Sequence, residues 1–406
     1  MSDKTLWTGI NKVYHQYNWL AQDEECDVCV LGGSITAALC ANEFQKKGID
    51  TILVSETPLG YMSTAIAGSV LRFGNANSLS KLSKKIGKDN AVSFFNECVV
   101  ALNEIEELEE EIGGFRFARR DGICYTKNPL HVDELHTEYL MCKNNGFDVS
   151  FLEKTDASDK LRFAIECATR LGSLDGEVDG YALIHRLSSN AKKNGARIYE
   201  NTVIDNINTK ADGVVLVTQY GKVIRCKKLI LAIGYKQNEY LNALEDIKTT
   251  FTIATRPLEN LNEFINHDII SRYKTDIYAR TTHDDRILMG GLDAAIIAHN
   301  TRWGKVLNPK KIIDTKYQEL ETAMNLMFSG IMNLEVVNKF NGVYGNTFDN
   351  LPVCGECAGY SNILFNMQSG ANPILSAQIC AKLLVDIYED NQNKMSNLFS
   401  CERKTL

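Results

Sequence analysis

Residues 27–56 are the part of this sequence that most limits how the chain can fold. An apolar strand over 27–31 is followed by the turn Gly32-Gly33-Ser34, a helix that begins near Ile35, and a second apolar strand over 52–54. This order predicts a parallel strand–helix–strand unit. The glycine turn allows a pyrophosphate to approach the backbone, and the helix N-terminus offers unpaired N–H groups to it. The unit therefore predicts a nucleotide cofactor.

The dinucleotide fingerprint in this unit is incomplete. Its usual form is G-x-G-x-x-G, and this chain has Gly32, Ser34 and Ala37 at the three positions. Both replacements are small, so a tight turn and close helix–strand packing remain possible, although an α/β crossover without a nucleotide is the alternative. Glu56 follows the second strand and can accept hydrogen bonds from ribose hydroxyls. An acidic residue there disfavours the 2′-phosphate of NADP.

Composition sets the outer limits on function. The chain has 406 residues, of which 44% are hydrophobic and 23% charged, and this predicts a soluble globular protein of two or three domains. With 51 acidic residues against 44 basic ones and no basic run, nucleic acid is not an expected partner. No run of 18 apolar residues and no secretory signal is found, so we expect no membrane span and a cytoplasmic protein.

The cysteines and histidines give no metal signal. Most of the 12 cysteines lie in apolar strand or helix patterns, as Cys29, Cys40 and Cys98 do, where a thiol behaves as a small hydrophobe. Cys354 and Cys357 are separated by two residues, Gly355 and Glu356. For this pair a structural role is favoured over a redox or metal role. The seven histidines are scattered, and we predict no metal site.

The remaining pattern alternates between helices and strands. Apolar spacing predicts an amphipathic helix within the first 21 residues and a long helix over 94–112 that ends at Gly113-Gly114. Residues 115–125 are expected to form two short strands joined by a turn. The other expected elements are a helix over 181–194, strands over 196–199, 214–217 and 229–234, a hairpin with His283-Asp284-Asp285 at its turn, and a C-terminal helix with Pro373 at its first position.

Taken together, these segments resemble the FAD-dependent oxidoreductases of the D-amino-acid oxidase-like superfamily, which includes glycine oxidase, sarcosine oxidase and amine dehydrogenases. The likeness covers nearly the whole chain. The segments that carry it are Gly32-Gly33-Ser34 with Glu56, residues 62–68, Gly195 to Tyr199 leading to Val203, residues 231–235, Tyr278 to Thr282, Asp349 to Pro352 with Gly355-Glu356, and Gly370-Ala371-Asn372.

The resemblance implies an α/β fold like that of p-hydroxybenzoate hydroxylase and D-amino-acid oxidase: a Rossmann-like FAD-binding domain with an inserted α+β substrate domain. The FAD-binding domain would contain residues 1–80, 170–245 and 325–406, and the substrate domain residues 81–169 and 246–324. The residues that the resemblance implies at the cofactor are Gly32, Gly33, Ser34, Ile35, Thr36, Ala37, Glu56, Ser63, Thr64, Ala67, Gly68, Val203, Ala232, Gly234, Gly370, Ala371, Asn372 and Ile374.

Within that set, the resemblance gives each segment a part of FAD. It places Val203 near the adenine, Ser63 and Thr64 near the flavin or its phosphates, and the turn Gly370 to Asn372 at the pyrimidine edge of the flavin. The N-terminus of the following helix carries partial positive charge, which stabilises the reduced flavin anion. Where relatives have several glycines in this turn, this chain has Ala371 and Pro373, whose Cβ atoms narrow the pocket.

The substrate side also departs from the family. Tyr344 stands where amino-acid oxidases carry an arginine for the substrate carboxylate, so a bidentate fork is missing and an amine or a differently held acid is expected. Gly342 stands where sarcosine oxidases carry the cysteine that binds flavin, which implies non-covalent FAD. Met289 falls near the position of the lysine that promotes reaction with oxygen, which favours a dehydrogenase over an oxidase.

The resemblance implies oxidation of the C–N bond of a small amine or amino acid by hydride transfer to flavin N5, with oxygen or a quinone or carrier protein as electron acceptor. The expected pocket residues are Tyr344, Arg280 and Arg72; for either arginine a structural ion pair is an equally good interpretation. Two alternatives remain: a flavin-fold protein that has lost FAD and acts as a binding module, and a nicotinamide-dependent dehydrogenase. The second leaves residues 63–68 and 370–372 without a purpose.

Overall fold

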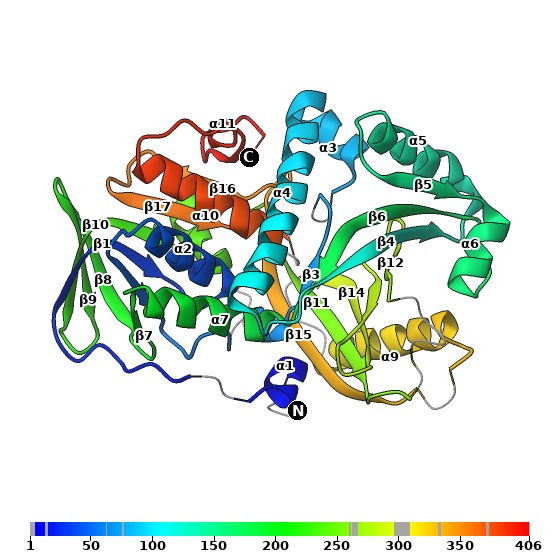
Figure 1. The fold of residues 1–406 in the computed structure, drawn as a ribbon, viewed down its shortest axis with the longest axis horizontal. Helices are drawn as coiled ribbons and strands as arrows, with labels where there is room; N and C mark the ends of the chain where they lie inside the picture. Colours follow the sequence, from blue (N-terminus) through cyan, green and yellow to red (C-terminus); the bar gives the residue numbers. More distant parts are fainter. Residues whose placement is uncertain are drawn as a thin grey trace.

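Two large sheets lie side by side in the molecule (Figure 1). The computed structural model describes residues 5–12, 15–61, 63–74, 77–259, 261, 267–295, 309–331, 334–370 and 373–405. Each sheet has its own apolar core, and helices cover both. The predicted α/β fold with a second α+β unit is therefore confirmed.

The first sheet is built around a parallel centre. Its order is β16-β17-β10-β1-β2-β7, in which β1 pairs in parallel with both β10 and β2. The apolar runs in these strands are buried on both faces, as expected for a parallel sheet covered by helices. The strands are β1 (Glu24–Leu31), β2 (Thr51–Val54), β7 (Arg197–Tyr199), β10 (Val223–Leu231), β16 (Val353–Glu356) and β17 (Ile363–Met367), and the ribbon β8 (Ile204–Lys210) and β9 (Gly213–Thr218) continues from β10.

Three helices cover one face of this sheet: α2 (Ile35–Lys46), α7 (Gly180–Lys193) and α10 (Ile374–Tyr388). The predicted strand–helix–strand unit β1–α2–β2 is confirmed, with the bounds shifted by a few residues at most. The long helix α4 (Lys88–Ile112) ends at Gly113, as its sequence pattern predicts, but begins at Lys88, six residues before the predicted start. It stands between the two sheets in Figure 1, and its apolar face joins the core formed by α2, α7 and α10.

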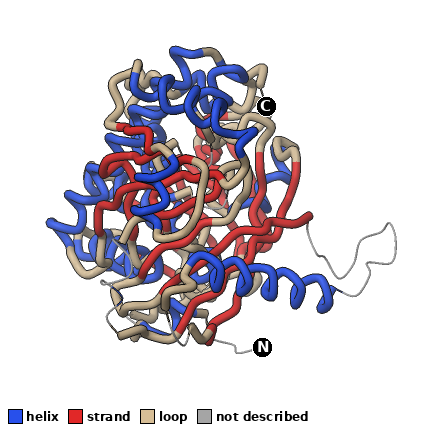
Figure 2. Tube along the Cα trace, turned by 90° about the vertical axis from the view of Figure 1, so that its right-hand side faces the viewer, coloured by secondary structure: helices blue, strands red, loops and turns tan. Residues whose placement is uncertain are grey.

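The second sheet has the order β15-β11-β14-β13-β12-β4-β6-β3, and β5 pairs with β6. Figure 2 shows α9 (Pro309–Met327) against these strands, where its apolar side chains close the second core. The hairpin predicted around residues 283–285 is confirmed as β13–β14. The strands are β3 (Val70–Leu71), β4 (Ala118–Thr126), β5 (Val149–Leu152), β6 (Cys167–Glu177), β11 (Asp246–Thr255), β12 (Ile269–Arg272), β13 (Tyr278–Thr281), β14 (Ile287–Ala295) and β15 (Val336–Asn346).

Shorter elements connect the sheets and cover their edges. No helix in the described ranges is long and apolar enough to cross a bilayer. The elements are α1 (Leu6–Ile10), α3 (Leu79–Ile86), α5 (Val132–Lys143), α6 (Lys154–Leu161), α8 (Asn238–Leu241), α11 (Ser396–Phe399) and the 3₁₀ turns η1 (Ser63–Ile66), η2 (Pro129–His131) and η3 (Gly234–Gln237).

Two local predictions are wrong. Residues 118–126 form the single strand β4, because a bulge between Arg120 and Gly122 keeps this polar stretch paired with β6. The predicted N-terminal helix is only α1, after which the backbone is extended at Asn11. The N–H groups of Tyr17 and Leu20 are instead taken by the side chains of Glu200 and Thr202, which hold this segment out of a helix. Residues 13 and 14 lie outside the described residues. Pro373 is the N-cap of α10, one residue before the predicted position.

The structure shows buried free cysteines and a disulfide bond. Cys29, Cys40 and Cys98 are buried free thiols, as their apolar patterns predict. Cys357 is bonded to Cys401, with their Cα atoms 5.9 Å apart. The sequence does not indicate this pair, because the two residues are 44 positions apart. Among the described residues, no group of three or more His, Cys, Asp or Glu side chains could hold a metal ion.

Helix α1 is short but firmly packed. Trp7 is 1% exposed, its indole N–H donates to the carbonyl of Ala67 at 2.8 Å, and Arg280 lies 5.2 Å from its ring centroid. Asn11 donates to Asp179 at 2.7 Å. The helix thus connects residues of the η1 segment with the second sheet.

This packing predicts that Trp7→Ala lowers the free energy of unfolding by about 3–5 kcal/mol, because a fully buried indole is lost and a cavity remains. Thermal and urea unfolding measure the change. Trp19→Ala is the matched control. Trp19 is 53% exposed, and its ring makes an edge-to-face contact with that of Tyr220. A loss of about 1 kcal/mol or less is expected. Equal losses in the two variants would contradict the assigned role of α1.

Candidate functional site

The ends of the central parallel strands meet at one edge of the first sheet. Gly32 follows β1 and donates to the carbonyl of Val54 at 2.9 Å. Ala232 follows β10 and donates to the carbonyl of Leu31 at 2.9 Å. Ser55 follows β2 and donates to the carbonyl of Tyr199 at 2.8 Å. In open parallel sheets ligands bind at this carboxyl edge, so the predicted cofactor segments meet where a ligand is expected.

The glycine turn is tightly enclosed. A Cβ atom on Gly32 would lie under 3.0 Å from the backbone of Ala232, and one on Gly33 would lie under 3.0 Å from the hydroxyl of Ser55. Gly32 also has a φ of +153°, which side chains rarely adopt. The backbone after β10 therefore leaves no room for a side chain at Gly32, and a side chain at Gly33 would have to displace the hydroxyl of Ser55.

The N-terminus of α2 receives a side chain from a distant segment. Ser34 is the N-cap but makes no side-chain capping bond. The N–H of Ile35 donates to the hydroxyl of Thr64 at 3.1 Å, and Thr64 is buried. The geometry of a helix leaves the N–H groups of Thr36 and Ala37 without intrahelical acceptors. Two predicted cofactor segments thus meet at one anion-binding helix end.

An exposed acidic residue, Glu56, follows β2 at this edge. Glu56 pairs with Lys236 of η3 at 3.4 Å. Thr202 donates to the carbonyl of Ser55 at 2.9 Å, which holds the turn before Val203 next to the end of β2. Glu56, Val203 and Gly234, the first residue of η3, therefore belong to one surface region of the sheet edge.

The predicted flavin loop lies between β17 and α10. Gly370 has a φ of +89° and donates to the carbonyl of Gly345 at 3.1 Å, which attaches the loop to the end of β15. Ile374, the first residue of α10, is buried. Ala371 and Asn372 lie outside the described residues.

The segment after the 3₁₀ turn η1 packs against the second sheet. A Cβ atom on Gly68 would lie under 3.0 Å from the ring of Tyr278, and so would one on Gly290. Burial raises the pKa of Tyr278 to about 12. Ser63 is exposed and Ala67 half-buried. Tyr278 is thus a contact that the sequence prediction missed, although strand alternation puts it on the same face as Arg280.

Gly342, which the resemblance places at the covalent flavin position, lies close to η1. A Cβ atom there would lie under 3.0 Å from the side chain of Ile66. Met289 points the other way and is fully buried in the core under α9.

The three predicted pocket residues have different surroundings. The hydroxyl of Tyr344 donates to the carboxylate of Asp293 in a short hydrogen bond across β11. Burial raises the pKa of Tyr344 well above its usual range, and Asp293 adds to this rise. Burial also raises the pKa of Asp293. The pair places an acceptor carboxylate on the second sheet, and no sequence pattern indicated Asp293.

Arg280 is enclosed by internal partners. Its guanidinium is 2% exposed and donates to Glu177 at 3.1 Å and to the carbonyl of Val178 at 3.1 Å, with Trp7 over one face. Glu177 pairs as well with Arg120 at 2.7 Å. This is the ion-pair arrangement that the sequence left open beside the pocket role.

Arg72 is half-buried at the end of β3 and donates to the hydroxyl of Ser271 at 3.0 Å. Close to it lies Asp175, which accepts the N–H of Phe73 at 2.8 Å. Burial raises the pKa of Asp175 to about 6, and Arg72 opposes that rise. Tyr344, Arg280 and Arg72 thus lie on the second sheet or its edge, each with its own partners.

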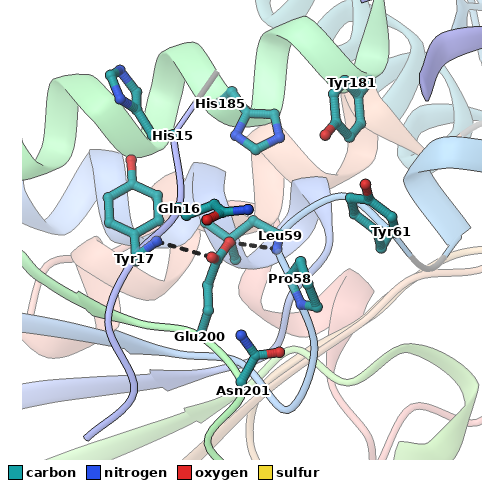
Figure 3. Close-up of a pocket in the computed structure, with 10 residues that line it drawn as sticks. All are labelled: His15, Gln16, Tyr17, Pro58, Leu59, Tyr61, Tyr181, His185, Glu200 and Asn201. Atoms are coloured by element: carbon teal, nitrogen blue, oxygen red, sulfur yellow. Dashed lines mark hydrogen bonds between the residues drawn. The ribbon is translucent and has the colours of Figure 1, made fainter. Parts of the chain in front are cut away.

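A pocket of about 200 Å³ lies beside the nucleotide edge (Figure 3). Glu200 is 2% exposed at its base and accepts the N–H groups of Tyr17 at 3.0 Å and Leu59 at 2.7 Å. Burial lowers the pKa of His185 to about 4 and raises that of Tyr17 to about 12, so both side chains are uncharged near neutral pH. The lining residues are His15, Gln16, Tyr17, Pro58, Leu59, Tyr61, Tyr181, His185, Glu200 and Asn201.

None of the predicted site residues lines this pocket. Its main structural effect is through Glu200, which connects the N-terminal segment, the loop after β2 and the turn before Val203. Glu200 therefore holds these segments together next to the nucleotide edge.

The comparison with protein families decides the class of the protein. The model of the DAO family, described as FAD dependent oxidoreductase, matches residues 27–387. The chain belongs to this FAD-dependent oxidoreductase family. The resemblance inferred from the sequence motifs is thereby confirmed.

Individual DAO-family relatives and structures are distant in sequence. The Bacillus subtilis protein YhfW, described as a Rieske 2Fe-2S iron-sulfur protein, is 22% identical over 391 residues, which are 95% of this chain and 72% of that protein. Gamma-glutamylputrescine oxidoreductase of Escherichia coli is 23% identical over 300 residues, covering 68% of this chain and 67% of the relative. Glycine oxidase from Geobacillus kaustophilus has a similar structure, with a TM-score of 0.78, 19% identity, and coverage of 94% of this chain and 99% of that one.

The DAO-family cofactor fits the residues present at the sheet edge. Gly32 and Gly33 carry no side chain that would block the N-terminus of α2, and within the described residues the side chain bonded to an N–H group there is that of Thr64. The exposed carboxylate of Glu56 stands at the end of β2, where a ribose is bound in dinucleotide folds. These features are the donor and acceptor set that FAD requires.

The buried Asp175 predicts a pH-dependent stability. Its pKa in the folded protein, about 6, is above its ordinary value of 3.8, so the folded state favours the protonated form. The stabilisation is therefore complete below about pH 4 and is lost as the pH rises through about 6. Asp175→Asn should remove this loss, so that the variant gains on the order of 3 kcal/mol relative to wild type between these limits.

Urea unfolding at several pH values measures this difference. Asp212→Asn, at an exposed turn, is the control and should follow the wild-type curve. A wild-type and Asp175→Asn pair with parallel curves would contradict the buried carboxyl assignment.

Proposed function

We propose that this protein oxidises the C–N bond of a small amine or amino acid, with non-covalently bound FAD as the hydride acceptor. The observation that carries the proposal is the meeting of Gly32, the α2 N-terminus and Thr64 at the carboxyl edge of the first sheet, within a chain of the DAO family. Bound FAD would supply a two-electron acceptor at flavin N5. The protein supplies its binding, the orientation of the substrate and the exclusion of water.

The proposed cofactor contacts follow the order of the sheet edge. The N–H groups of α2 near Ser34 to Ala37 and the hydroxyl of Thr64 would hold the pyrophosphate, and Glu56 the ribose. Val203, Ala232 and Gly234 would surround the adenine. Ser63, Ala67, Gly68, Gly370 and Ile374 would contact the flavin, together with Ala371 and Asn372.

The presence of two sheets supports a two-domain arrangement, but β3, β15 and most of β6 belong to the second sheet although the sequence boundaries assign their residues to the FAD-binding domain. Residues 1–80, 170–245 and 325–406 would hold FAD, and residues 81–169 and 246–324 would shape the substrate site. Helix α4 belongs to the second group in this division but packs on the core of the first, so it would also fix the two units against each other.

The substrate side supports an amine over a tightly held carboxylate. Tyr344 replaces the arginine fork, and its hydroxyl already donates to Asp293. The carboxylate of Asp293 would attract a substrate ammonium, and desolvation there favours the neutral amine from which hydride is transferred. Arg72 would hold an anionic group of the substrate, and Arg280 would shape the pocket wall. The names of the relatives, glycine oxidase and gamma-glutamylputrescine oxidoreductase, support the same substrate class.

The electron acceptor is proposed to be a quinone or carrier protein, or oxygen. Position 289 is a methionine that is buried in the core under α9, so it supplies no lysine to promote reaction with oxygen. This supports an FAD-dependent dehydrogenase over an oxidase.

The first test is the absorbance spectrum of the purified protein before and after acid precipitation. Bands near ~370 and ~450 nm that move to the supernatant are expected for non-covalent flavin. Amines and amino acids should then bleach the ~450 nm band without air. A flat spectrum that stays flat after FAD is added would instead favour the binding-module alternative.

The ribose contact gives a second test. Glu56→Ala should weaken FAD binding to the apoprotein about 10-fold, because a hydrogen bond to a charged group contributes roughly 1.5–3 kcal/mol. Quenching of FAD fluorescence measures the dissociation constant. Glu239→Ala removes an exposed carboxylate from the nearby helix α8 and should leave the constant unchanged. A loss of equal size in both variants would indicate a general charge effect.

A further inference from the structure

The last residues that the structure describes pack near the predicted flavin loop. We call residues 400–405 the C-terminal tail; it follows α11, beyond the part of the chain that the family model matches. Arg403 of this tail forms a two-point ion pair with Asp349, with Nε–Oδ2 and Nη2–Oδ1 distances of 2.7 and 2.9 Å. The side chains are 5% and 0% exposed. A surface ion pair would contribute little, but this one is buried and bidentate.

The ion pair is fully hydrogen-bonded. Arg403 donates also to the carbonyls of Pro352, Leu351 and Ser400 at 3.0–3.1 Å. Asp349 accepts the hydroxyl of Thr405 at 2.7 Å. Removing one partner would therefore leave a buried charge without its main partner, which is the costly way to break such a pair.

A short chain of hydroxyl groups leads from this pair to the flavin loop. The hydroxyl of Thr347 donates to the carbonyl of Leu351 at 2.7 Å and lies 3.2 Å from both the carboxylate of Asp349 and the hydroxyl of Ser369. The N–H of Thr347 donates to Ser369 at 3.1 Å. Asp349, Thr347 and Ser369 are all buried. The residue after Ser369 is Gly370, where the proposed contact with the flavin begins.

The other end of the loop is attached separately. Ser376 in the first turn of α10 donates to Gln368 at 2.7 Å, and Gln368 donates to Asn366 of β17. The contacts between Thr347 and Ser369 thus connect the loop with the Asp349 turn, in addition to the bond from Gly370 to Gly345, and the tail holds that turn through Asp349. Cys401, two residues before Arg403, is bonded to Cys357, so the tail is held at a second point.

We propose that Arg403 is a positioning residue for the flavin: through Asp349, Thr347 and Ser369 it fixes Gly370, the residue at which the proposed contact with the flavin begins. This inference rests on the proposed function. With Gly370 fixed, the N-terminus of α10 would keep its position relative to bound FAD, and its partial positive charge would favour the reduced cofactor. The tail therefore tunes both the affinity for FAD and its reduction potential.

The test is Arg403→Met, with Arg225→Met as its control. Arg225 is an exposed residue of β10 whose partner Glu25 is 4.0 Å away. Arg403→Met should raise the dissociation constant of FAD at least 10-fold and make the midpoint potential of the bound flavin more negative, both measured spectroscopically. Arg403→Lys should recover part of each change. Arg225→Met should match the wild type. An unchanged potential in Arg403→Met would overturn the proposal.

A double-mutant cycle tests the route through Ser369. If Arg403 acts through the hydroxyl chain, Arg403→Met and Ser369→Ala together should weaken FAD binding no more than the stronger single variant. Additive losses would overturn the proposed route.

A milder variant covers the case in which Arg403→Met does not fold. Thr405→Val removes one bond to Asp349 and keeps the ion pair, and it should shift the potential in the same direction by a smaller amount. An unshifted potential in folded Thr405→Val would then count against the tail. Wild-type protein that binds no FAD would refute the proposed function itself, and this result differs from every outcome above.

Discussion

The parallel pairing of β1 with β10 and β2 is the constraint on which the rest of the structure depends. It places Gly32, Ser55 and Ala232 at one edge, although these residues come from segments up to 200 positions apart. The turn at Gly32 then has no space for a side chain, and α2 begins directly after this turn. The proposed contacts of the dinucleotide with the α2 N-terminus, Glu56 and Ala232 follow from this strand pairing.

The second sheet depends on a different kind of interaction. Where β6 ends, Glu177 joins Arg120 of β4 and Arg280 of β13, and Trp7 covers the guanidinium of Arg280. Buried charges need several partners to offset the cost of desolvation, and here they obtain them from separate strands and from the N-terminal helix. An arginine at this position is thus satisfied internally, while the less enclosed Arg72 and the Tyr344–Asp293 pair remain for the substrate side.

The sequence predicted the fold class and the unit at residues 27–56 because both rest on local periodicity and on glycines whose conformation is fixed by the turn. It failed where distant side chains compete with local pattern. Tyr17 and Leu20 have helical spacing, but Glu200 and Thr202 take their N–H groups. The sequence favours a turn at Arg119 to Gly122, yet a bulge keeps these residues in β4. Asp293 and Arg403 give no local signal, because their roles arise from residues far along the chain.

The order of strands in the first sheet has a consequence for synthesis of the protein. The central strand β1 is made early, but its partner β10 begins at residue 223, and β17 and α10 occupy residues 363–388. A ribosome-bound chain therefore cannot complete this sheet until nearly all of the protein has been made. Because such long-range pairing is slow and leaves strand edges exposed, the nascent chain is expected to need protection from aggregation for most of its translation.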